Sequence, residues 1–258
     1  MMNGLRSELL KYKRTFMGKL IVLVPVFFAG YALIMQATLM KHPLSQNRSW
    51  MWDNLLALIF NWWTFVFLPL GFALFAALAA GQEKKSGNYR ALRSRNVSPM
   101  LLWIYKVAAM AVYSLLSAMV LTIAAILAGV LAKSGAIPFR QIAAASIVCW
   151  AASLALIPIQ LWAATWKGLF LSMGLGFAGM AAGVLAAPEA FWFTVPWSWA
   201  IRLMCPIAEV HPNGSVLESG NPLMDTSVIP TGIAVSIAVF LAVTLLTAVW
   251  FNRREEKC

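Results

Sequence analysis

The stretch VAAMAVYSLLSAMVLTIAAILAGVLA, residues 107–132, contains no charged side chain and decides the fold class. Five further charge-free runs of at least 21 residues lie at 20–40, 54–82, 141–166, 168–188 and 226–252. A helix needs roughly 20 apolar residues to cross a bilayer core, whereas a barrel strand needs only about ten. Because only helices and closed barrels satisfy their backbone hydrogen bonds in lipid, the six runs predict six transmembrane helices.

The composition agrees with this class. The chain is 61% hydrophobic and 11% charged, whereas a soluble domain carries about 25% charged residues. We therefore expect an all-α integral membrane protein that forms a single domain over residues 1–258. The expected spans are 18–40, 55–80, 100–131, 142–165, 168–187 and 229–251.

Lysine and arginine are unevenly divided between the two sides that six crossings define. With the N-terminus inside, fifteen of the 20 basic residues fall in inner segments and five in outer segments. Inner segments of membrane proteins carry an excess of Lys and Arg, so both termini are expected in the cytoplasm. The net charge of +11 is then a topology signal and a contact with the headgroups of the lipid bilayer. Nucleic acid is not an expected partner.

Two apolar segments are too short to span. Residues 3–16 place Leu5, Leu9, Tyr12 and Phe16 at helical spacing, which predicts an amphipathic helix on the inner leaflet. A basic flank is the alternative, but it explains the charges and not the apolar stripe. Residues 189–208 are aromatic and interrupted by two prolines, which predicts a re-entrant or interfacial hairpin on the outer side. A polar outer loop continues from it to residue 228.

The fifth span has a face of small residues that includes Gly176, Gly179 and Gly183. Gly179 and Gly183 form a GxxxG pattern. Small faces let two helix backbones approach closely, so these glycines are expected at a tight helix–helix contact. The partner helix belongs either to this chain or to another subunit, and the sequence leaves both open.

Catalytic and nucleotide-binding motifs are absent from the sequence. It contains no P-loop, no HExxH and no nucleophile elbow. The three cysteines, Cys149, Cys205 and Cys258, are too scattered for a metal site, and no cofactor is expected. The spans hold no ionisable residue at mid-membrane, where proton-coupled transporters generally keep one. We therefore expect no enzymatic activity and an energy supply from a partner protein.

The inner loop 82–98, QEKKSGNYRALRSRNVS, is where that partner is expected to dock. Gly87 is expected to open a short helix, and Ser98 with Pro99 to end it. Tyr89 and Leu92 give this helix an apolar edge among arginines that include Arg93. The alternative is a solvated loop whose charges only mark the inner side.

The six spans, the segment ELLKYKR at 8–14 and an inner loop that opens with Glu83 and Gly87 together resemble the type-2 ABC exporter permeases, the ABC-2 fold. The aromatic hairpin before the last span is similar to one in that fold. The sequences PWSW at 196–199, RLMCP at 202–206 and HPNG at 211–214 resemble the lantibiotic-immunity permeases of the MutE/EpiE type. The resemblance covers nearly the whole chain.

This resemblance implies a complex in a bacterial plasma membrane, made of two permease subunits, identical or different, and two ABC ATPase subunits. It implies that the complex expels a lanthionine-containing peptide antibiotic, which gives self-immunity or resistance. The loop 82–98 would be the coupling helix that receives the stroke of the ATPase. Its candidate residues are Glu83, Gly87, Tyr89, Leu92 and Arg93.

A peptide that acts at the outer leaflet needs a capture surface there, and Trp192, Trp197 and Trp199 are the candidates. The alternative is that these rings only anchor the protein at the headgroup level. Two other functions remain open. The chain is either a type-2 ABC permease for another substrate, such as a bacitracin-like peptide or a lipid, or a membrane sensor or scaffold that does not transport.

Overall fold

The computed structural model describes residues 2–13, 15–39, 48–85, 87, 98–218 and 220–256. In this part of the chain the fold is helical, with an isolated β-bridge between Val210 and Val216. The helices are α1 (Met2–Lys13), α2 (Phe16–Leu39), α3 (Arg48–Trp62), α4 (Leu68–Lys85), α6 (Pro99–Leu131), α7 (Phe139–Ser153), α8 (Leu156–Lys167), α9 (Leu169–Ala186), α10 (Pro196–Ala208) and α11 (Val228–Glu256). A π-helical segment, Trp63–Phe67, joins α3 to α4, and short 3-10 helices lie at Trp192–Thr194 and Pro222–Met224.

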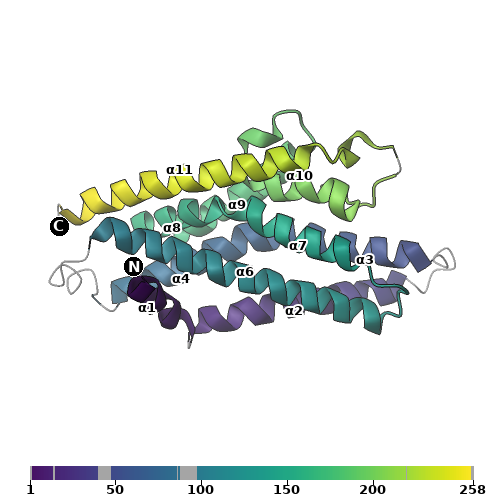
Figure 1. Ribbon diagram of the computed structural model, residues 1–258, viewed down its shortest axis with the longest axis horizontal. Coiled ribbons are helices and arrows are strands. Elements are labelled where there is room, and N and C mark those ends of the chain that lie inside the picture. Colours follow the sequence, from purple (N-terminus) through teal and green to yellow (C-terminus); the bar gives the residue numbers. More distant parts are fainter. Residues whose placement is uncertain are drawn as a thin grey trace.

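The long helices run along one axis and form a bundle (Figure 1). Both chain ends lie at the same end of this bundle, together with α1, the end of α4 and the start of α6 (Figure 1). We call it the terminal end. The start of α3, the turn between α6 and α7, and the segment between α10 and α11 lie at the opposite end, the distal end. An even number of passes is required to bring both chain ends together.

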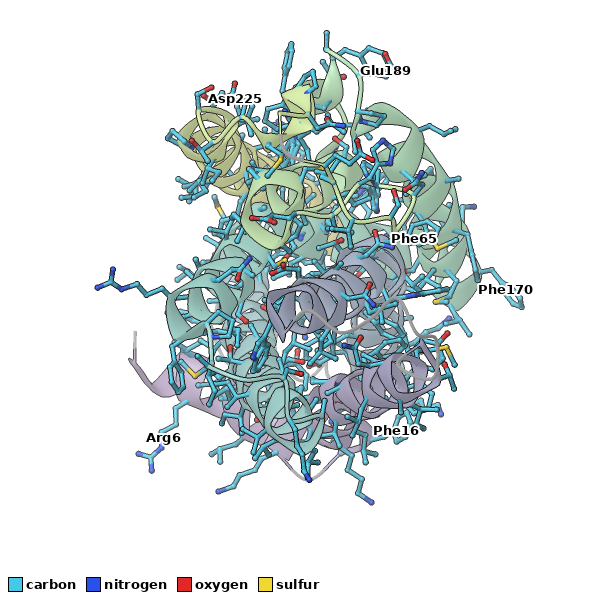
Figure 2. The ribbon with its side chains drawn as sticks, turned by 90° about the vertical axis from the view of Figure 1, so that its right-hand side faces the viewer. Arg6, Phe16, Phe65, Phe170, Glu189 and Asp225 are labelled. Atoms are coloured by element: carbon cyan, nitrogen blue, oxygen red, sulfur yellow. The ribbon has the colours of Figure 1, made fainter. Side chains whose placement is uncertain are left out.

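The length and composition of the helices account for six passes. Within the described residues, five spans qualify on their own, namely Phe16–Thr38, Trp52–Lys85, Pro99–Leu131, Leu169–Ala186 and Val228–Arg254. The sixth is α7 with α8, a pair bent by 43° at a short break. Large apolar side chains cover the outside of the bundle; Phe170, 89% exposed, points away from it (Figure 2). Such a surface is typical of membrane contact. The expected all-α membrane protein with six spans is therefore confirmed.

Two prolines account for the irregular stretches within the spans. Proline lacks the N–H that a helix needs, and its ring collides with the carbonyl four residues earlier. Leu154 is the residue four positions before Pro158, and the break between α7 and α8 falls at Leu154 and Ala155. Pro69 stands four residues after Phe65, which lies in the π-helical segment that widens the helix there.

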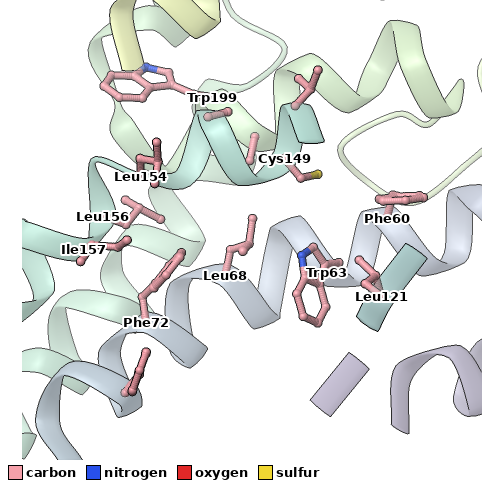
Figure 3. Close-up of a cluster of buried hydrophobic side chains, with 14 of the residues drawn as sticks. Phe60, Trp63, Leu68, Phe72, Leu121, Cys149, Leu154, Leu156, Ile157 and Trp199 are labelled. Atoms are coloured by element: carbon pink, nitrogen blue, oxygen red, sulfur yellow. The ribbon is translucent and has the colours of Figure 1, made fainter. Parts of the chain in front are cut away.

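The aromatic segment 189–208 packs into the bundle. Pro196 begins α10, in keeping with the preference of proline for the first helical position. Ser198 Oγ donates to the carbonyl oxygen of Val195 at 2.8 Å, which fixes the turn before the helix. Residue Trp199 of α10 belongs to the same buried cluster as Leu154 and Leu156 (Figure 3). The predicted hairpin is thus a short helix that contacts α7 and α9.

Candidate functional site

Helix α1 is docked against α4 and α6 at the terminal end. Tyr12 is buried, and its ring meets those of Phe75 and Tyr113 edge-on, with centroid distances of 5.4 and 5.5 Å. Tyr113 Oη donates to the carbonyl oxygen of Leu9 at 2.8 Å. Near the start of α1, a Cβ on Gly4 would lie 2.4 Å from the ring of Tyr105, so only glycine permits this approach. The apolar side of the expected amphipathic helix therefore faces the protein.

Four charged side chains from α1, α4 and α6 form a closed ring, which we call the charge ring. Lys11 Nζ donates to Glu8 Oε1 at 2.5 Å and to Glu83 Oε1 at 2.7 Å. Lys106 Nζ donates to Glu83 Oε1 at 2.8 Å and lies 3.5 Å from Glu8 Oε2. Each carboxylate thus meets both ammonium groups, and the ring carries no net charge.

Burial makes the charge ring sensitive to the loss of any member. Glu8 and Glu83 are 3% exposed and Lys106 is 6% exposed. At 2.8 Å and an effective dielectric constant of about 20, the attraction of one pair is about 6 kcal/mol. Desolvation offsets this, because it costs several kcal/mol per ion. The complete ring therefore adds little net stability, whereas removing one partner leaves an uncompensated buried charge, at a cost of about 3–5 kcal/mol.

Lys11 is the most exposed member of the ring, with 24% of its side chain accessible. Burial acts to lower the pKa of its ammonium group. Hydrogen bonds to Glu8 and Glu83 and the charges of these two carboxylates outweigh that effect, and the pKa is raised above 10.5. Lys11 therefore stays charged at every physiological pH, and the ring stays closed.

The charge ring ties together the two helix ends that flank residues 86–97. Glu83 lies in the last turn of α4, and Lys106 lies two turns into α6. Gly87 has a φ of +60°, and its N–H donates to the carbonyl oxygen of Lys84 at 3.4 Å. Gly87 therefore follows the end of α4, and the helix that it was expected to open would lie in 88–97, outside the described residues, so that expectation stays a prediction. The other predicted residues, Tyr89, Leu92 and Arg93, lie outside the described residues.

Glu83 was predicted as a site residue, whereas Glu8 and Lys106 were not. The span Trp52–Lys85 reaches further toward the terminal end than the expected 55–80 and so includes Glu83, whereas Lys106 lies within the expected span 100–131. The sequence did contain one signal for Lys106. Lys106 is a single cation between the apolar residues 99–105 and the charge-free run 107–132. A lone cation within an apolar run needs a buried partner.

Two of the three tryptophans that were predicted to capture a substrate are buried, and the third, Trp197, is half-buried. Trp192 is 8% exposed and Trp199 is 1% exposed, and Trp199 Nε1 donates to the carbonyl oxygen of Phe193 at 3.0 Å. The expectation that these two rings face lipid is therefore wrong, because they complete the packing of α10. The large exposed rings of this segment are those of Phe191 and Phe193, each about half exposed.

The glycine face of α9 packs against helices of the same chain. A Cβ on Gly176 would lie 3.0 Å from the Cβ of Ala73 on α4. A Cβ on Gly179 would lie 2.2 Å from the ring of Trp197, and a Cβ on Gly183 would lie 2.8 Å from the carbonyl oxygen of Trp197. Trp197 thus fills the groove that the absent side chains leave, which brings α10 close to α9.

The fold and this site define a multi-pass membrane protein in which a docked N-terminal helix is joined to the ends of two spans. Residues 4–183, about 70% of the chain, match the family described as ABC-2 family transporter protein. The chain belongs to this family. Its members are membrane transport components, and the family implies an ABC ATPase as partner. No curated protein matched the chain significantly. No solved structure did so either.

Proposed function

We propose that this chain is the permease subunit of an ABC exporter that expels a lantibiotic, a cationic amphipathic peptide antibiotic, from a bacterial plasma membrane. Family membership supports the role of transport component. The observation that carries the proposal further is the charge ring, because it makes α1 and the ends of α4 and α6 one mechanical unit at one end of the bundle. A force applied to residues 86–97 would reach two spans at once.

The proposed docking surface for the ATPase is the loop 82–98, with Glu83, Gly87, Tyr89, Leu92 and Arg93 as its candidate residues. Glu83 holds the stem of this loop to Lys106 and Lys11, so a stroke of the ATPase would move α4 and α6 together. This assignment places the terminal end in the cytoplasm. The excess of basic residues in the predicted inner segments supports the same orientation.

The proposed capture surface is the pair of rings in the segment between α9 and α10, Phe191 and Phe193. Both side chains are about half exposed and precede α10, in which Trp199 is buried and Trp197 is half-buried. An apolar ligand that covers two half-exposed rings gains roughly 1.5–3 kcal/mol, or about tenfold to a hundredfold in affinity. Trp197 serves this surface indirectly, since it anchors α10 to Gly179 and Gly183.

A second permease subunit, identical or different, is part of the proposal. The glycines of α9 are not free for it, because α4 and Trp197 already occupy that face. A partner permease would therefore pack on other exposed apolar side chains, such as Phe170 or Leu185.

Resistance measurements test the proposal. Deleting the gene in its own host should lower the inhibitory concentration of a lantibiotic. Expressing the wild-type chain should restore that concentration. The double variant Phe191→Ala with Phe193→Ala should restore it only in part, whereas Phe177→Ala, which truncates an equally exposed ring on α9, should restore it fully. A deletion that changes sensitivity to bacitracin alone would point to a permease for that peptide. Unchanged sensitivity to every peptide would favour a lipid permease, a sensor or a scaffold.

A further inference from the structure

An apolar cavity of about 230 Å³ lies between α2, α4 and α6. Its walls include Met17 and Val24 from the first third of α2, Phe67 and Phe75 from the π-helical segment and α4, and Ser117 from the middle of α6. Phe75 also contacts Tyr12 of α1. The cavity is therefore in the half of the bundle nearer the terminal end, directly beside the docked helix α1.

The hydroxyl groups in the wall are already engaged within the protein. The hydroxyl groups of Tyr113, Ser114 and Ser117 donate to the carbonyl oxygens of Leu9 (2.8 Å), Ala111 (2.8 Å) and Ile21 (3.2 Å). A peptide backbone placed here would leave its own N–H and C=O groups unpaired in an apolar site, which is costly. The chemistry of the wall therefore fits a hydrocarbon ligand.

The size of the cavity fits one extended hydrocarbon chain. By the same measure, a site for one water molecule needs only about 10–15 Å³, so a cavity of about 230 Å³ has room for a stretch of hydrocarbon chain. The hydrocarbon that surrounds a spanning protein is the acyl chain of a phospholipid.

We propose that this cavity binds one acyl chain of a phospholipid from the leaflet at the terminal end. Nearby basic side chains support a phospholipid as the source of this acyl chain. Lys13 and Lys19 are exposed on either side of Met17, at the junction of α1 and α2, where a phosphate headgroup would lie. The bound lipid would contact α2, α4 and α6 together, including Phe75, whose ring packs on Tyr12 of α1, and so it would stabilise the docking of α1. The inference does not depend on which substrate the protein transports.

Gly71 offers a way to fill the cavity without straining the fold. It lies in α4 and lines the cavity, and a Cβ built on it meets no atom within 4 Å. The substitution Gly71→Leu should therefore place a branched side chain in the space of the lipid chain. Gly174→Leu is the matched control, because Gly174 is exposed on α9, is equally free of neighbours and does not line the cavity.

The test uses the full chain in nanodiscs that contain a phospholipid with a photoactivatable diazirine on its acyl chain. After irradiation, mass spectrometry maps the labelled residues. We expect labelling of residues 17–24 and 70–75 to exceed that of the lipid-facing residues 241–246 of α11. Gly71→Leu should lower this labelling by roughly tenfold to a hundredfold. That factor corresponds to the loss of the apolar contact that one buried aliphatic side chain makes. Gly174→Leu should leave it unchanged.

Two results obtained without any peptide would overturn the inference. One is labelling of residues 17–24 and 70–75 that does not exceed the labelling of α11, which would make the lipid ordinary boundary lipid. The other is Gly71→Leu protein that melts at the wild-type temperature and is labelled as strongly as wild type. Displacement of the label by a peptide antibiotic would assign the cavity to the transported substrate, and that result would also contradict the proposal.

Discussion

Replacing Lys106 by Met removes one of the two cations from the charge ring while keeping a long, unbranched side chain. Glu8 and Glu83 then share a single cation, Lys11, in a site where both carboxylates are 3% exposed. An unpaired buried charge costs about 3–5 kcal/mol. Because the ring joins α1 to the ends of α4 and α6, we expect this cost to loosen α1 and leave the bundle folded.

Hydrogen exchange in nanodiscs measures this loosening. Each 1.4 kcal/mol corresponds to a factor of ten, so the amide protection of α1 should fall by about a hundredfold to a few thousandfold. Protection in α9 should not change. Lys13→Met, the same substitution at an exposed position of α1, should leave the protection of α1 close to wild type.

The double variant Glu83→Gln with Lys106→Met separates charge from packing. It restores neutrality, because Glu8 and Lys11 remain as a pair. We expect it to recover most of the protection that Lys106→Met loses. Equal loss in the single and double variants would show that shape and not charge holds α1, and the reasoning about the ring would then be refuted.

Three further predictions concern the loop, the glycine face and the pH dependence of α1 docking. Leu92→Asp should leave the protein in the membrane but abolish transport-dependent resistance, and normal resistance would favour a solvated loop. Gly179→Ala should lower the melting temperature, because its Cβ would lie 2.2 Å from Trp197 and overpacking costs about 1–3 kcal/mol; Gly174→Ala, with open space around it, should not. The pKa of Lys11 is raised above 10.5 on folding, so its contribution to α1 docking is complete below pH 10.5 and is lost as the pH rises through the folded-state pKa. Exchange rates of α1 should show this alkaline step in wild type but not in Lys11→Met.

The spans could be predicted from the sequence because each depends on one local property. A run such as 107–132 excludes charge over the thickness of a bilayer, and this alone predicts the end of α6 within one residue of its observed position. The bend between α7 and α8 is harder to predict, since Pro25 sits in α2 without interrupting that helix whereas Pro158 breaks one. Whether a proline breaks a helix depends on the packing around it.

The charge ring could not be predicted from local pattern. Its members Glu8, Glu83 and Lys106 come from three helices, and their pairing depends on the tertiary docking of α1. The same limit applies to α10. Its aromatic composition predicted a membrane surface, but the burial of Trp199 follows from the close approach of α9, α10 and α7. Aromatic rings fill a core as readily as they anchor at an interface.

Site-specific photocrosslinking in native membranes tests the central claim most directly. A photoreactive amino acid at Leu92, in the loop 82–98, should capture a protein that mass spectrometry identifies by its P-loop sequence as an ABC ATPase. The same probe at Val216, in the distal segment between α10 and α11, should capture none. Capture of an ATPase at Val216 would contradict the account. So would the absence of capture at both positions in membranes where the transporter is active.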